Sequence, residues 1–132
     1  AEAWQMSNAP VLSMAAHKAA VDIFDEVGMV KILKKQKLIS GYLEFIVDDV
    51  NASLAASDKA LEIITPRNWD ERGSQVSVIA HGYGKDLFDS LTAEGVISDW
   101  REPNVIRMAP IPLYNSYKDI FRFGKILKKA LK

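Results

Sequence analysis

Apolar residues recur at helical spacing in two long stretches of the chain. The first stripe, in steps of four, consists of Ala15, Ala19, Ile23 and Val27. It predicts an amphipathic helix that Ser13 caps and that ends near Gly28. The second stripe, in steps of three and four, consists of Ile39, Leu43, Ile46, Val50 and Leu54. It predicts a longer helix that follows the basic segment 31–37, contains Gly41 and runs to about Ala56.

The rest of the chain alternates between short β-type runs and turn residues. Strands are predicted at 61–65, 76–80, 96–100 and 105–109. A polar loop separates the first two strands at 66–73. One further helix is predicted to open at the turn 82–84 and close at Gly95, and the last helix begins with a capping box of Ser116 and Asp119. This order predicts an α+β fold, a small and mostly antiparallel sheet of about four strands with helices packed on one face.

Composition narrows the classes of function. The chain has 132 residues, of which 48% are hydrophobic, enough for the core of a single domain over 1–132. Its 17 basic and 17 acidic residues cancel, so we expect neither nucleic acid nor a membrane surface as a partner. The absence of cysteine excludes thiolate metal sites, cysteine nucleophiles and disulfides. No apolar run approaches the ~20 residues of a membrane helix, and a cytoplasmic protein is expected.

The beginning of the chain predicts that it is part of something longer. It starts without Met, and Trp4, Met6, Val11 and Leu12 follow at once. We therefore expect a fragment that was cut from a longer protein at a domain boundary.

Few residues suggest metal or phosphate chemistry. His17 and His81 have no carboxylate at ligand spacing, so no metal site is expected and both are interpreted as surface or half-buried imidazoles. The segment GYGKD at 82–86 lacks the Ser or Thr that follows Lys in a phosphate loop. It is interpreted as a turn between a strand and a helix.

Two places favour binding of a small ligand. Strand alternation places Arg107 on the face opposite Ile106 and Met108, and the strand ends at once in the proline-rich segment 109–112. A guanidinium held there suits bidentate binding of a carboxylate. At the other place, Ser7 and Asn8 lie in an extended polar segment before a proline. The structural alternatives are an ion pair of Arg107 with a residue such as Asp99, and an Asn8 that only caps the helix after it.

Three blocks of sequence resemble the C-terminal portion of the kynureninase family. They are MSNAPVL at 6–12, IITPRNWDERGSQ at 63–75 and, most specifically, NVIRMAPIPLYNS at 104–116. The resemblance covers nearly the whole chain. It implies a pyridoxal phosphate enzyme of the aspartate aminotransferase fold type that hydrolyses L-kynurenine, or 3-hydroxykynurenine, to anthranilate, or 3-hydroxyanthranilate, and L-alanine. It also implies that Arg107 holds the substrate's α-carboxylate and that Ser7 and Asn8 border its aromatic ring and carbonyl.

The resemblance also implies what this chain lacks. In the family, the lysine that binds pyridoxal phosphate and most other cofactor ligands lie upstream, and no lysine here resembles that motif. We therefore expect the small C-terminal domain of a homodimeric enzyme of tryptophan catabolism, inactive without its large cofactor domain and with no catalytic residue of its own. The alternatives are a non-catalytic α+β binding or oligomerisation module, or the small domain of another pyridoxal phosphate enzyme of this fold type. An upstream cofactor lysine in the same gene would exclude the module.

Overall fold

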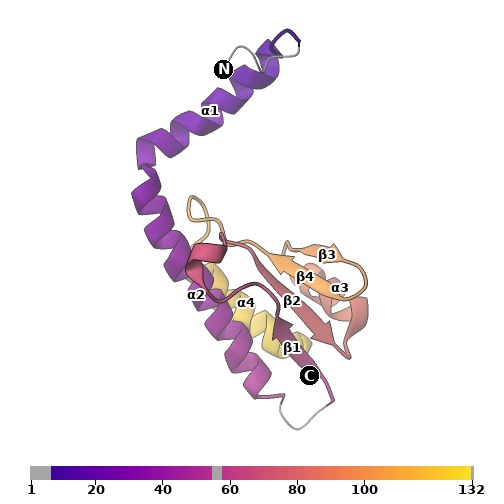
Figure 1. Ribbon diagram of the computed structural model, residues 1–132. Helices are drawn as coiled ribbons and strands as arrows, with labels where there is room; N and C mark the ends of the chain where they lie inside the picture. The colour runs from indigo at the N-terminus through magenta and orange to yellow at the C-terminus, as the bar shows by residue number, and fades with distance from the viewer. Residues whose placement is uncertain (1–6, 55–57, 132) are drawn as a thin grey trace. The chain divides into compact units, whose positions relative to one another are not determined.

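The computed structural model of the chain describes residues 7–54 and 58–131 (Figure 1). It divides into two compact units, residues 1–33 and 34–132. The helices are α1 (Val11–Val27), α2 (Met29–Ala52), α3 (Gly84–Ala93) and α4 (Tyr117–Ala130), and η2 (Trp69–Glu71) is a single 3₁₀ turn. The strands are β1 (Ala60–Ile63), β2 (Val76–His81), β3 (Asp99–Arg101) and β4 (Val105–Met108). No helix in the described ranges is long and apolar enough to cross a membrane.

Helix α1 ends where the sequence predicts, but its N-cap residue differs from the predicted one. The predicted cap was wrong, because Pro10 occupies the N-cap position without a side-chain cap bond and Ser13 lies inside the first turn. Proline is well suited to the start of a helix because its fixed φ is compatible with that position. The predicted end is confirmed. Gly28 has φ +84°, a conformation that favours glycine, and its N–H donates to the carbonyl of Phe24 at 2.8 Å.

Helix α2 begins earlier and ends earlier than the helix that the apolar stripe predicts. The basic segment 31–37 is helical rather than a lead-in, because lysine is a good helix former and needs no core contact to stay in a helix. The helix ends at Ala52 instead of near Ala56, and residues 53–54 form a turn. The helix passes through Gly41 without a break. A Cβ there would lie 3.3 Å from the Trp69 ring, so glycine allows that ring to pack closely on α2.

The sheet has the strand order β1-β2-β4-β3 and every neighbouring pair is antiparallel. Three predicted strands are confirmed to within two residues at each end. The strand predicted at 96–100 begins only at Asp99. The reason is that the N–H of Val96 donates to the carbonyl of Leu91 at 3.0 Å and so completes the end of α3. The polar loop 66–73 is confirmed apart from η2, which Asn68 caps through the N–H of Asp70.

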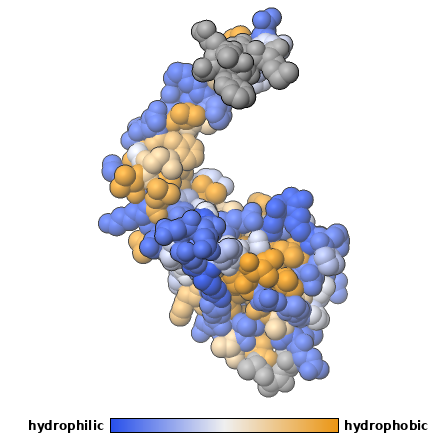
Figure 2. Space-filling model, viewed as in Figure 1, coloured by the Kyte–Doolittle hydropathy of each residue, from blue (hydrophilic) through white to orange (hydrophobic). Residues whose placement is uncertain are grey.

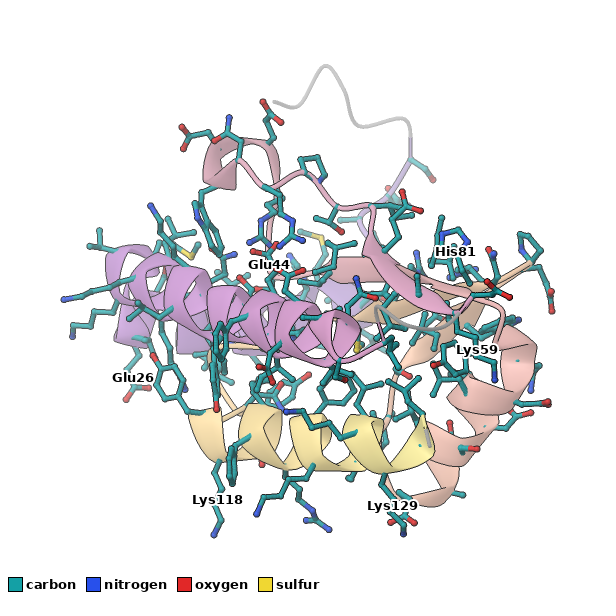
Figure 3. All side chains as sticks on the ribbon, turned by 90° about the horizontal axis from the view of Figure 1, so that it is seen from below. Glu26, Glu44, Lys59, His81, Lys118 and Lys129 are labelled. Carbon is teal, nitrogen blue, oxygen red and sulfur yellow. The ribbon has the colours of Figure 1, made fainter. Side chains whose placement is uncertain are left out.

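The core of the second unit lies between one face of the sheet and three helices. Its buried residues come from α2, α3, α4 and the strands, and include Ile39, Leu43, Val47, Val50, Val76, Val78, Leu87, Leu91, Ile106, Ile120 and Leu127. Helices α2 and α4 run side by side on this face (Figures 1 and 3). The capping box predicted for α4 is present, with Ser116 and Asp119 bonding to each other's backbone N–H groups. The α+β fold with helices on one face of a four-stranded antiparallel sheet is therefore confirmed.

The other face of the sheet has no helix packed on it within the second unit. In Figure 2, which has the view of Figure 1, hydrophobic surface lies over the middle of the sheet and hydrophilic residues border it. By alternation along the strands, this open face carries Ser77 and Ile79 of β2, Asp99 and Arg101 of β3, and Val105 and Arg107 of β4.

Candidate functional site

Arg107 lies on the open face of the sheet, in the strand between β2 and β3. Ile106, one residue earlier, is 3% exposed in the core, whereas the Arg107 side chain is 32% exposed on the opposite side. This confirms the orientation predicted from strand alternation. The register places Arg107 directly across from Ser77 on β2 and from Asp99 on β3. Its backbone is thus paired on both sides.

The carboxylate of Asp99 binds Arg107 through a single oxygen. Asp99 Oδ2 accepts hydrogen bonds from Arg107 Nε at 2.7 Å and from Arg107 Nη2, and a third from Arg101 Nε at 3.0 Å. The hydrogen bond from Arg107, followed by that from Arg101, holds the pKa of the Asp99 carboxyl below its usual value. The ion pair that was considered as the structural alternative for Arg107 is therefore present.

This pairing uses only one edge of the guanidinium. Arginine has five N–H donors in a fixed plane. The contacts of Arg107 to Asp99 use Nε and Nη2. Among the described residues, no hydrogen bond involves Nη1 of Arg107. The end of the guanidinium formed by Nη1 and Nη2 therefore has donors left for a second acceptor.

The segment that follows Arg107 is fixed in place, as the prolines predict. The carbonyl of buried Pro112 accepts a hydrogen bond from Lys35 Nζ of α2 at 2.6 Å. Within the segment, the N–H of Ile111 donates to Asn115 Oδ1 and the N–H of Asn115 donates to the carbonyl of Ile111, both at 2.8 Å. The exit from β4 is thus tied to α2 and to its own turn, which limits movement of the backbone at Arg107.

Ser7 and Asn8, the other predicted site residues, lie just before α1 and are exposed. The helix has no side-chain cap bond, so the alternative in which Asn8 only caps α1 was wrong. Both residues belong to the first unit, whereas Arg107 belongs to the second. The structure therefore does not bring Ser7 and Asn8 together with Arg107 within one unit.

Comparison with known proteins identifies the family. The model of the kynureninase C-terminal domain matches residues 32–127. The chain belongs to the kynureninase family. It is 53% identical over 128 residues to the kynureninase of Flavobacterium johnsoniae, covering 97% of this chain and 29% of that protein. It is 50% identical over 131 residues to the kynureninase of Christiangramia forsetii, covering 99% of this chain and 30% of that protein. The chain thus spans less than a third of the length of these kynureninases.

Arg101 is a residue near the site of this kynureninase-family chain that the sequence analysis missed. It shares the carboxylate of Asp99 with Arg107, and its own side chain is 60% exposed. A signal was available in the sequence. Asp99 and Arg101 are two residues apart, so alternation along one strand places them on the same face as each other. The pairing of β3 with β4 then places both of them near Arg107.

A second cluster that the sequence analysis missed holds the loop between β1 and β2 against α2. The guanidinium of Arg72 lies 3.8 Å from the centroid of the Trp69 ring, and its Nη2 lies 2.9 Å from Glu44 Oε1. The Arg72 side chain is 2% exposed and that of Glu44 is 10% exposed. Figure 3 shows Glu44 between α2 and this loop. The cluster fixes the segment that leads into β2, the strand beside Arg107.

Neither histidine forms part of a metal site in the part of the chain that the structure describes. His17 is exposed on α1, and His81 Nε2 lies 2.7 Å from Glu62 Oε2 at the end of the sheet. The expectation that no carboxylate lies near His81 was wrong, because strand pairing brings β1 beside β2. No group of three metal-ligating side chains occurs among the described residues.

Arg107 also does not line the hollow described between the end of β4 and α4. This hollow has a volume of about 500 Å³, and its walls include Met108, Ile120 and Phe123. Met108 lies on the core-facing side of β4, so the hollow lies on the side away from Arg107. The candidate carboxylate site is therefore part of an open surface rather than of a cavity.

Proposed function

We propose that the intact protein is a kynureninase that hydrolyses L-kynurenine, or 3-hydroxykynurenine, to anthranilate, or 3-hydroxyanthranilate, and L-alanine. The present chain would be its small C-terminal domain. Membership of the kynureninase family supports this proposal. The observation that carries it is the position of Arg107, a guanidinium on an open sheet face with donors unused by its neighbours. Such an arrangement requires a second surface, from elsewhere in the protein, to enclose a substrate.

In this proposal Arg107 binds the α-carboxylate of the substrate. Two parallel N–H···O bonds fix both the position and the plane of a carboxylate, which a lysine ammonium cannot do. Fixing the amino acid at that end orients the bond between Cβ and Cγ relative to the groups that act on it. Arg107 is therefore a substrate-binding residue, and the chain contributes no catalytic residue.

Ser7 and Asn8 are proposed to border the aromatic ring and carbonyl of the substrate. Their exposure leaves both side chains accessible at the start of α1. The Asn8 amide would donate a hydrogen bond toward the aryl ketone and so stabilise negative charge that develops on its oxygen.

Pyridoxal phosphate is proposed as the cofactor, and the lysine that binds it and most of its other ligands are proposed to lie in the large domain. Residues 82–83 form the turn that leads into α3, and a Cβ at Gly82 would lie 3.0 Å from the Lys59 side chain, so that side chain already fills the space beside the glycine. Three lysines that resemble no cofactor motif form surface ion pairs: Lys85 with Asp89, Lys128 with Asp49 and Lys129 with Glu94. When bound, the cofactor supplies an electron sink for cleavage of the carbon–carbon bond.

The length of the relatives supports a further part of the proposal, a second domain. Because the chain covers about 30% of the Christiangramia forsetii protein, we propose a large cofactor domain that precedes it in the same polypeptide. A homodimer and a cytoplasmic location remain predictions of the same proposal.

Replacement of Arg107 in the full-length enzyme tests the role of this residue. We expect Arg107→Lys to raise KM strongly and to lower kcat/KM by about one to two orders of magnitude. Arg107→Ala should remove roughly 3 kcal/mol or more of transition-state stabilisation, on the scale of unmade charged hydrogen bonds. Steady-state kinetics with L-kynurenine and thermal melting should be measured on the same preparations.

Arg67→Lys is the matched control, because Arg67 also binds an aspartate through two nitrogens but lies exposed beside Asp48. It should leave kcat/KM unchanged. A melting temperature lowered by the Arg107 substitutions together with unchanged kcat/KM would show that Arg107 is only a structural residue.

A further inference from the structure

Asp99 contacts the side of the Arg107 guanidinium and leaves its Nη1 and Nη2 end available in the candidate carboxylate site. Asp99 Oδ2 accepts from Nε, at 2.7 Å, and from Nη2, so it lies along the side of the guanidinium. A carboxylate that approaches along the arginine's long axis meets the Nη1 and Nη2 end instead. One guanidinium can therefore hold Asp99 and a substrate carboxylate at the same time.

We propose that Asp99 is a positioning residue, which holds the guanidinium of Arg107 by its side so that its end is presented to the substrate carboxylate. This inference rests on the proposed function of Arg107. An arginine side chain has many rotamers, and a binding site that must order it at each encounter loses affinity. Asp99 lies directly across from Arg107 in the sheet register, so the backbone pairing of β3 with β4 holds the two side chains together before any ligand arrives.

The charges of Arg101, Arg107 and Asp99 favour binding of a further carboxylate over an ion pair that is complete in itself. Arg101 and Arg107 carry two positive charges, and both donate to the single carboxylate of Asp99. The set retains one net positive charge, which one incoming carboxylate would neutralise. If Asp99 served only to neutralise Arg107, the second arginine on the same oxygen would have no function.

The opposite role for Asp99 is competition with the substrate for Arg107. A competing carboxylate would occupy the Nη1 and Nη2 end of the guanidinium, which the substrate carboxylate needs in this proposal. The contacts lie along the side instead, and Nη1 is not engaged by any described residue. The geometry therefore favours support of the site over occlusion.

The test is a double-mutant cycle in the full-length enzyme, with L-kynurenine as substrate and L-alanine, the product that retains the substrate's α-carboxylate, as a competitive inhibitor. We expect Asp99→Asn to raise both KM and the inhibition constant of L-alanine about tenfold, while kcat changes less than about threefold. In the Arg107→Lys background, the same substitution should change KM less than about twofold, because Asp99 acts through Arg107. Asp99→Glu should restore part of the lost affinity.

Glu102→Gln provides the control, since Glu102 is an exposed carboxylate near β3 that accepts a hydrogen bond from Trp100 Nε1 rather than from an arginine. It should leave KM unchanged. If Arg107→Lys raises KM but Asp99→Asn does not, the proposed function stands and the positioning role is wrong. A lower KM in Asp99→Asn would show that Asp99 competes with substrate, which also overturns the inference. If Arg107→Lys itself leaves KM unchanged, the proposed function of Arg107 fails.

Discussion

At the scale of single residues, Arg72 and Glu44 form an ion pair whose cost and benefit depend on burial. The atoms lie 2.9 Å apart, but their directions do not make an aligned hydrogen bond, so the attraction is mainly Coulombic. Burial raises the pKa of the Glu44 carboxyl, and the charges of Arg72 and Arg67 only partly oppose this effect. Removal of Arg72 would therefore leave a buried carboxylate without its main countercharge.

We predict that Arg72→Met lowers the free energy of unfolding by about 3 kcal/mol at neutral pH, in the range of other broken buried pairs. Its cost should depend on pH. The pKa of Glu44, already raised in the folded protein, should rise further without Arg72. A carboxyl with a raised folded-state pKa favours folding at low pH and loses that contribution as pH rises through its folded-state pKa.

Denaturant unfolding at several pH values checks this prediction. The gap in stability between Arg72→Met and the unchanged chain should widen from about pH 4 towards pH 8. Arg67→Met is the control, because its exposed pair with Asp48 should contribute at most about 1 kcal/mol. A gap that stays constant with pH would show that loss of the contact with Trp69, rather than of the charge, destabilises the variant.

At the scale of elements, the packing of α2 on α4 depends on a glycine in the middle of a helix. Glycine at position 124 costs α4 about 1 kcal/mol of intrinsic helix stability relative to alanine. A Cβ on Gly124 would lie 2.8 Å from Ile46 Cγ2 and 3.2 Å from Ile46 Cδ1. The close approach of the two helices therefore requires glycine at this position.

We predict that Gly124→Ala destabilises the chain by about 1–3 kcal/mol despite its better helix propensity, because the overpacked helices must separate. The stability change caused by Gly124→Ala should change sign when the side chain of Ile46 is shortened. In an Ile46→Ala background, Gly124→Ala should be neutral or stabilising, since the new methyl group fills space that Ile46 has left. Thermal unfolding of the four variants of this cycle measures the coupling, and additive effects would contradict the packing argument.

At the scale of the whole molecule, α1 presents apolar side chains that no described residue buries. No residue of α1 is buried, and Leu12 and Val11 are 88% and 73% exposed. An apolar surface of this kind usually binds a partner, and the proposed large domain of the same polypeptide is a candidate for that partner. Trp4 and Met6, two apolar residues that precede α1 in the sequence, lie outside the described residues.

We predict that the isolated chain releases no anthranilate from L-kynurenine, even with added pyridoxal phosphate. The physical reason is that Arg107 lies on an open sheet face and that the lysine which binds the cofactor is proposed to lie in the large domain. Chromatographic detection of anthranilate checks the prediction, with the full-length enzyme as the positive control. Sustained turnover by the chain alone would show that the proposed large domain is unnecessary for catalysis.

Local sequence was sufficient wherever one short segment contains the whole cause of a feature. The capping box of α4, the end of α1 at Gly28 and the orientation of Arg107 were all predicted correctly. Each depends on residues within a few positions of one another, through a side-chain bond to the backbone, a left-handed glycine or the alternation of a strand. The α+β class followed in the same way from the order of the helical and alternating stretches.

Only the tertiary structure decided which residues from distant segments meet. It placed Glu62 beside His81, Arg72 between Trp69 and Glu44, and Ile46 against Gly124. It also showed that Arg101 and Arg107 both donate hydrogen bonds to Asp99. The ion pair with Asp99 leaves the Nη1 and Nη2 end of the Arg107 guanidinium available for another acceptor. Sequence periodicity defines the face on which a side chain lies. Strand order, register and the distance between helices define its neighbours, because those depend on how the whole core packs.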